Sequence, residues 1–98
     1  MKIKDLQKEE KPREKMIEKG SEVLTDVELL AIIIRSGGKN NSATNLSREL
    51  ISKFGNLKNV LTADITQLTN FKNIDIAKAT SIKAVEEICK RYLTPFRG

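Results

Sequence analysis

The chain has 98 residues, a net charge of +5 and a pI near 9.5, so it is long enough for one small domain that folds without an obligatory metal or disulfide. It contains no histidine and one cysteine, Cys89, which excludes histidine acid–base catalysis, His/Cys zinc sites and internal disulfides. No apolar run reaches the ~20 residues of a membrane span, and no charged-then-apolar leader opens the chain, so we expect a cytoplasmic protein without cofactor or metal.

The hydrophobic pattern is helical almost throughout, with no convincing alternation of the kind that strands show. A first helix is predicted over residues 9–19, with Pro12 in its first turn and Gly20 at its end. Basic and acidic side chains are mixed along residues 1–19. This helix is therefore expected to be solvated rather than to form a basic arm.

A second helix is predicted to begin at a capping box, in which Thr25 holds a backbone amide and Glu28 reciprocates from three residues on. Apolar residues from Val27 to Ile34 cover most of its surface. We therefore expect it to be the central buried helix. Gly37 and Gly38 are expected to end it.

Three further helices are predicted before the last one. The first runs over about residues 42–54, with Gly55 as its C-cap. A short one follows around residues 57–61. Another begins at the box-like sequence Asp64-Ile65-Thr66-Gln67.

The last helix is predicted from Asp75, its N-cap, to about Leu93. Cys89 falls on its apolar side and is expected to be a buried, inert thiol. The predicted apolar stripe comprises Ile82, Val85, Ile88 or Cys89, and Tyr92. Charge spacing predicts three ion pairs: Lys83–Glu87, Glu86–Lys90 and Glu87–Arg91. The predicted fold class is all-α, a compact bundle of five or six short helices.

The turn between the last two helices, residues 70–75, is the first candidate binding site. In such a hairpin the amides of the turn and of the next helix point outward together, where the helix dipole favours an anion. Two positions that usually require glycine hold Asn73 and Asp75. Asn adopts positive φ more readily than most residues, whereas Asp75 places a carboxylate at the anion site. Positive charge is concentrated here, since seven basic and four acidic residues follow Gly55.

Several stretches of the sequence together resemble the N-terminal domain of bacterial RadC-type proteins. They are Lys11-Pro12-Arg13-Glu14-Lys15, Gly20-Ser21-Glu22-Val23-Leu24-Thr25-Asp26-Val27-Glu28-Leu29-Leu30-Ala31 with Arg35-Ser36-Gly37, Ser47-Arg48-Glu49-Leu50 to Phe54-Gly55, and Ala77-Lys78-Ala79. The similarity keeps their order and spacing over nearly the whole chain.

The resemblance implies an all-helical module over residues 1–93, with a helix-hairpin-helix at about 64–93 and a linker at 94–98. In complete family members this module precedes a JAB/MPN-type metalloprotease-like domain that is not in this sequence. The family is commonly labelled as DNA repair proteins. The resemblance therefore implies DNA and the missing C-terminal domain as partners and no catalysis by this chain, and it leaves the oligomeric state open.

The hairpin departs from the family pattern, which is similar to Lys-Gly-Ile-Gly-Pro-Ala-Lys-Ala. This chain has Lys72-Asn73-Ile74-Asp75-Ile76-Ala77-Lys78-Ala79, so both glycines and the proline are replaced. An Asp N-cap stabilises a helix by ~1 kcal/mol relative to Ala. Its carboxylate also competes with a phosphate for the same amides and repels it by on the order of 1 kcal/mol or more.

Two interpretations of the hairpin stay open. In the first, it contacts the DNA backbone without reading bases, through Lys72, Asn73, Ile74, Asp75, Ala77 and Lys78. In the second, Ile74 plugs the core, Asp75 caps the helix and the lysines are solvated, and the module is structural or binds another protein. No aromatic residue is placed at the tip for base stacking, so sequence-specific recognition is not expected.

The loop of residues 35–42 is a second candidate anion site, through Arg35, Gly37, Gly38 and Lys39. Glycines, cations and an oncoming helix start are what an anion-binding nest requires. The alternative is a plain interhelical turn. The Gly-Lys-Ser/Thr ending of a P-loop is missing.

Three acidic residues, Asp26, Glu28 and Asp64, fall in the first turns of predicted helices or at their caps. Capping and the helix dipole explain them there, and no nucleophile–base pair accompanies them. We therefore expect a non-catalytic accessory domain that binds DNA weakly, with an interaction module as the alternative.

Overall fold

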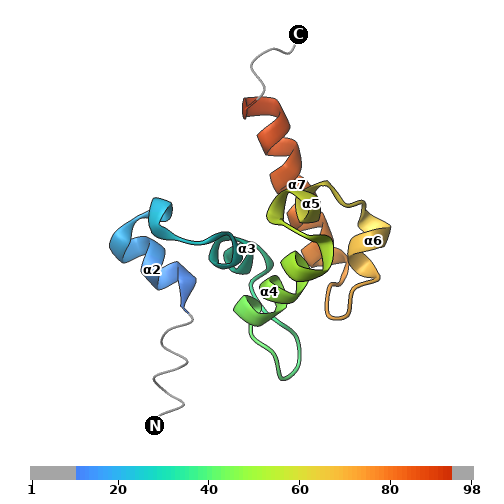
Figure 1. Cartoon of the computed structure of the whole chain (residues 1–98), viewed down its shortest axis with the longest axis horizontal. Helices are drawn as coiled ribbons and strands as arrows, with labels where there is room; N and C mark the ends of the chain where they lie inside the picture. Colours follow the sequence, from blue (N-terminus) through green and yellow to red (C-terminus); the bar gives the residue numbers. More distant parts are fainter. Residues whose placement is uncertain (1–10, 94–98) are drawn as a thin grey trace.

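The computed structural model describes residues 11–93, and every structural statement below refers to that part of the chain. With labels as in Figure 1, the elements are α2 (Pro12–Lys19), the 3-10 turn η1 (Ser21–Val23), α3 (Asp26–Ile34), α4 (Ala43–Phe54), α5 (Leu57–Thr62), α6 (Ile65–Thr69) and α7 (Ile76–Leu93). No strand occurs among the described residues, and the all-α prediction is confirmed. The predicted start of the first helix and the linker at 94–98 lie outside this range.

Helices α3 to α7 each begin where a capping side chain accepts a hydrogen bond from an amide of the first turn. At α3 the Thr25 hydroxyl oxygen accepts from the Glu28 amide at 3.2 Å, and the Glu28 carboxylate accepts from the Thr25 amide at 2.9 Å. Asp64 and Gln67 form the same reciprocal box at α6, with distances of 2.8 and 3.0 Å. Each such cap stabilises its helix by about 1 kcal/mol, so these starts follow from sequence within one turn.

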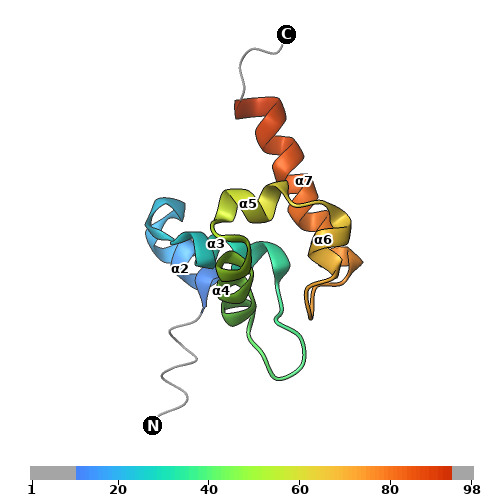
Figure 2. The same cartoon turned by 45° about the vertical axis from the view of Figure 1, so that its right-hand side comes forward.

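The core lies where α3, α4, α5, α6 and α7 meet. Helix α3 packs mainly on α4, and α7 packs on α3, α5 and α6, whereas α2 packs on α3 and on η1. Figures 1 and 2 show α2 at one side of the molecule and α6 at the other. The core residues are Leu30, Ile34, Leu46, Leu50, Val60, Ala63, Leu68, Ile74, Ala79 and Ile82.

The second half of α7 extends away from the other helices (Figures 1 and 2). Ile82 is fully buried, but Ile88 is 57% exposed and Tyr92 is 78% exposed. The predicted apolar stripe is therefore covered by other helices at Ile82 but not in the last turns of α7. Amphipathic spacing marks an apolar side but does not supply the helix that would cover it. Cys89 is half-buried rather than buried.

Ion pairs on α7 differ from the predicted set in one member. Lys83 pairs with Glu86 at 2.7 Å, three residues on, instead of with Glu87. The hydrogen bond from the Lys83 ammonium lowers the pKa of the Glu86 carboxyl below its usual value. The other two predicted pairs are present, Glu86 with Lys90 at 3.8 Å and Glu87 with Arg91 at 3.0 Å.

Helix α2 is attached to the bundle through its surface. None of its residues is buried, and the Lys15 ammonium forms a salt bridge with Glu28 of α3 at 3.1 Å. The hydrogen bond from the Thr25 amide, and next the Lys15 ammonium, lower the pKa of the Glu28 carboxyl. Among the described residues, none of the helices has the length and apolar character that crossing a membrane requires.

Candidate functional site

The two loops that the sequence marks as candidate sites lie side by side. Gly38, in the loop between α3 and α4, has a φ of +90°, and a methyl group on its Cα would come within 2.7 Å of the Asn73 carboxamide. Figure 2 shows both loops at the same end of the molecule. The two loops predicted as separate sites are thus neighbours in the structure.

Helix α3 ends at Ile34, so Gly37 and Gly38, which are predicted to end it, lie inside the loop of residues 35–42. Arg35 has a φ of +69° and a ψ of −32°, and the Ser36 amide donates to the Ile34 carbonyl at 2.8 Å. This is a γ-turn centred on Arg35, of the rare and strained type with positive φ. A long side chain at such a position is an outlier that local packing must maintain.

Gly37 has a structural role in this loop. It is buried, and a methyl group on its Cα would lie 2.1 Å from the carbonyl oxygen of Ser42. The backbones on the two sides of the loop are therefore too close for any side chain at this position. Lys39 is exposed at the tip of the loop.

The turn of residues 70–75 forms without glycine. Asn73 has a φ of +70°, a left-handed conformation that Asn adopts more readily than most residues. Ile74 is 3% exposed and belongs to the core, and Phe71 packs against that core. Side chains inside the molecule thus anchor a turn whose amides lie at the surface.

Asp75 accepts a hydrogen bond from one amide of this region and leaves other amides without an acceptor. Its carboxylate accepts a hydrogen bond from the Lys78 amide at 3.0 Å, as an N-cap does. The amides of Asn73, Ile76 and Ala77 donate to no acceptor within residues 11–93. The predicted conflict between carboxylate and anion is therefore partial.

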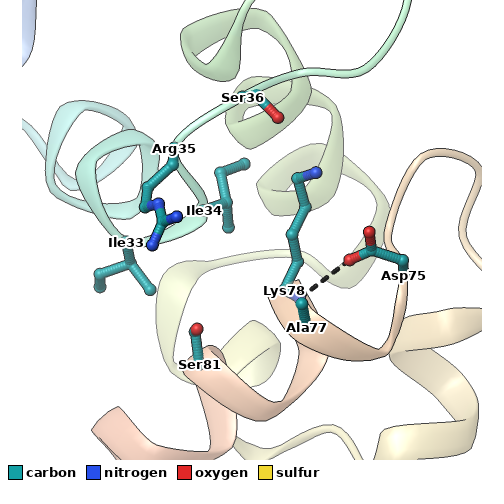
Figure 3. A pocket seen from close by; sticks show the side chains of 8 residues that line it. All are labelled: Ile33, Ile34, Arg35, Ser36, Asp75, Ala77, Lys78 and Ser81. Atoms are coloured by element: carbon teal, nitrogen blue, oxygen red, sulfur yellow. Dashed lines mark hydrogen bonds between the residues drawn. The ribbon is translucent and has the colours of Figure 1, made fainter.

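A hollow of about 220 Å³ lies between the end of α3 and the start of α7. Figure 3 shows Arg35 on one side of it and Lys78 on the other. Neither cation has an acidic partner among the described residues. The hollow is lined by Ile33, Ile34, Arg35, Ser36, Asp75, Ala77, Lys78 and Ser81. Ser36 and Ser81 have no signal in the sequence that would single them out.

A second, open depression adjoins the first and includes Lys72, Asn73 and Gly38. Asp75 and Lys78 line both hollows, so the two are neighbours on the surface. Lys39 lines neither of them. This surface thus combines free amides and three lysine or arginine side chains around one carboxylate, a composition suited to a monoanionic group such as a phosphodiester.

Carboxylates elsewhere in the described residues form no reactive cluster. Within residues 11–93 no three His, Cys, Asp or Glu side chains gather in an arrangement that could hold a metal ion. Glu28 and Asp64 are engaged in the capping boxes described above.

Comparison with known proteins gives a consistent family assignment. Residues 3–80 match the UPF0758 N-terminal family. A UPF0758 protein of Clostridium botulinum strain Eklund 17B is 44% identical over 94 residues, which are 96% of this chain and 41% of that protein. The corresponding protein of strain Hall is 44% identical over 93 residues, 95% of this chain and again 41% of that protein.

This chain therefore spans about two fifths of the length of these relatives. No solved structure matches it. Because the family match covers most of the chain, and because UPF0758 is the RadC-like family, the chain belongs to the UPF0758 N-terminal family of RadC-like proteins.

Proposed function

We propose that this chain is a non-catalytic accessory domain that binds DNA weakly and without sequence preference. In this proposal α6, the turn of residues 70–75 and α7 form a degenerate helix-hairpin-helix. The observation that carries it is the set of unpaired amides at Asn73, Ile76 and Ala77, which lie next to Lys72 and Lys78. Backbone amides at a helix start are natural partners for a phosphate oxygen.

The balance of charges explains why binding would be weak. Asp75 repels a phosphate by on the order of 1 kcal/mol at a surface dielectric. Lys72 and Lys78 each offset part of that repulsion. Phosphate contacts of this kind position a protein on DNA and carry no sequence information, and the longer relatives would bring further contacts and any catalytic activity.

The proposal is tested by charge reversal. The double variant Lys72→Glu plus Lys78→Glu should lose affinity for unrelated duplexes alike, measured by fluorescence anisotropy at two salt concentrations. Lys53→Glu plus Lys58→Glu makes the same change in net charge on exposed positions of α4 and α5, and it should weaken binding less. Equal losses in the two double variants, or none in either, would contradict the proposal.

An interaction module is the second candidate function, and the exposed end of α7 favours it. Ile88, Tyr92 and Leu93 are 57%, 78% and 72% exposed, and clustered apolar side chains at a surface mark contact sites for other proteins. Sedimentation velocity and a DNA titration at low salt distinguish the candidates. Self-association that Ile88→Ser plus Tyr92→Ser removes, together with absence of DNA binding, would favour the second.

A further inference from the structure

We propose that Arg35 and Lys78 together bind a second phosphodiester of the DNA strand that contacts the turn of residues 70–75. The loop between α3 and α4 is then part of the nucleic-acid interface. This inference rests on the proposed DNA binding and adds to it a residue from a different part of the sequence. Its structural basis is the hollow that Arg35 and Lys78 both line.

The charges around this hollow are unbalanced in the absence of a ligand. Arg35 and Lys78 line its walls together with one acid, Asp75. The Asp75 carboxylate is engaged by the Lys78 amide, and neither cation forms a salt bridge within residues 11–93. Like charges that face one hollow from opposite sides repel each other, and an anion between them offsets that repulsion.

The charges that line the hollow also indicate which class of anion would bind there. A phosphodiester carries one negative charge, which matches the two cations and one carboxylate. A phosphate monoester or free phosphate carries between about 1.5 and 2 charges at pH 7, so Asp75 repels it more strongly. Ser36 and Ser81 add hydroxyl groups to the lining of the hollow, and hydroxyls contact the phosphates of a DNA backbone.

The hollow lies next to the turn of residues 70–75. Lys78 and Asp75 line both this hollow and the depression that contains Lys72 and Asn73. A strand whose phosphate contacts the turn therefore passes the mouth of the hollow. The planar guanidinium of Arg35 can donate two parallel hydrogen bonds to one phosphate, which a lysine cannot do.

The strained conformation of Arg35 supplies a test that separates binding from folding. Its φ of +69° suits glycine better than arginine. Arg35→Gly should therefore melt at a temperature no lower than Asn40→Gly, which places glycine at the other non-glycine residue of positive φ in the same loop. Arg35→Gln is the second variant, since it removes the charge but keeps an unbranched polar side chain.

The measurement is fluorescence anisotropy with a labelled duplex at several salt concentrations. Both Arg35 variants should raise Kd by about tenfold and reduce the slope of log K against log salt by about one. Asn40→Gly should bind as the wild type does. Lys58→Gln, which removes one charge from α5, should change Kd by less than about twofold.

Each other result has a defined meaning. If the Arg35 variants match Lys58→Gln while Lys72→Glu plus Lys78→Glu loses binding, the inference on Arg35 is overturned and the proposed function stands. Failure of the wild type to bind duplex at low salt overturns both. Inorganic phosphate is added in a parallel NMR titration, and saturation of the Ser36 and Lys78 amides at phosphate concentrations that leave DNA binding unaffected overturns the assignment to a phosphodiester.

Discussion

Asn73 and Asp75 stand at the two turn positions where a hairpin of this kind usually requires glycine, and they fit the observed turn by different means. Asn73 adopts the positive φ directly, because Asn tolerates this region better than most residues. Asp75 instead serves as the cap of α7 through the Lys78 amide. The turn thus accommodates both side chains, and the Asp75 carboxylate makes the electrostatic potential there less favourable to anions.

Removing only the charge of Asp75 should strengthen DNA binding. Asn caps a helix about as well as Asp, so Asp75→Asn should leave the free energy of unfolding within about 0.5 kcal/mol of wild type. Loss of a repulsion of about 1 kcal/mol should tighten Kd about fivefold. Asp64→Asn, the same change at the cap of α6, is the control in the anisotropy assay, and equal effects of the two would argue against a role for position 75.

A second feature at the scale of one residue is the environment of Ser47. Its side chain is fully buried in α4, and its hydroxyl has no hydrogen-bond partner among the described residues. An unpaired buried hydroxyl destabilises the folded state by about 1–3 kcal/mol. Ser47→Ala should therefore raise the free energy of unfolding by about 1 kcal/mol, measured by urea denaturation. Ser52→Ala, on the exposed side of the same helix, should change it little; a loss of stability in Ser47→Ala would point to a partner for this hydroxyl.

At the scale of elements, Lys83 links α7 to the end of α5. Its ammonium donates to the carbonyl of Leu61 at 3.1 Å and to that of Ala63 at 2.7 Å, and pairs with Glu86 at 2.7 Å. A cation at a helix C-terminus satisfies carbonyls that lack partners and interacts favourably with the dipole. The junction between two helices of different length is thus held by one side chain.

Replacing this ammonium with an apolar group should loosen the junction. Lys83→Met keeps the length of the side chain and loses its hydrogen bonds, so we expect a loss of about 1–2 kcal/mol in the free energy of unfolding. The pKa of Glu86 should rise toward its usual value of 4.5, as NMR titration would show. Lys53→Met, at an exposed position, is the control; an unchanged Glu86 pKa in Lys83→Met would contradict the assigned pairing.

At the scale of the whole molecule, α2 is the part held by the least buried surface. It has no buried residues and contacts α3 and η1, so its amides should exchange with solvent through local opening well below the global free energy of unfolding. Its salt bridge with Glu28 connects this attachment to pH. The pKa of the Glu28 carboxyl is lowered in the folded state. The stabilisation that the ionised carboxylate provides is therefore fully present above the usual pKa of the carboxyl, and it is lost as the pH falls through the lowered pKa of the folded state.

The expected pH dependence is measured by thermal unfolding of the wild type and Glu28→Gln. Glu28→Gln should melt at a lower temperature near pH 6. That difference should shrink as the pH falls below the usual carboxyl value of 4.5. Glu49→Gln, an exposed carboxylate on α4 without a salt bridge among the described residues, should show no such trend. A constant difference across this range would contradict the role assigned to Glu28.

The sequence predicts those features whose causes lie within a few residues. The boxes at Thr25 and Asp64 depend on groups three residues apart, and the helix starts there are found correctly. The contact of Gly38 with Asn73 depends on tertiary packing across 35 positions, 38 to 73, and no local pattern contains it. For the same reason the sharing of one hollow by Arg35 and Lys78 is a finding of the structure alone.

The unbroken course of α7 has a mechanical consequence for the longer relatives. Its 18 residues run from the hairpin to Leu93, about 27 Å of rigid rod. The direction of any domain attached after Leu93 would therefore be set by how the turn of residues 70–75 places the start of α7. One extra residue within the helix would rotate such an attachment by about 100°, whereas seven would bring it back to within about 20° of its original orientation. We therefore expect the length of this helix to be kept more strictly than the identity of its side chains.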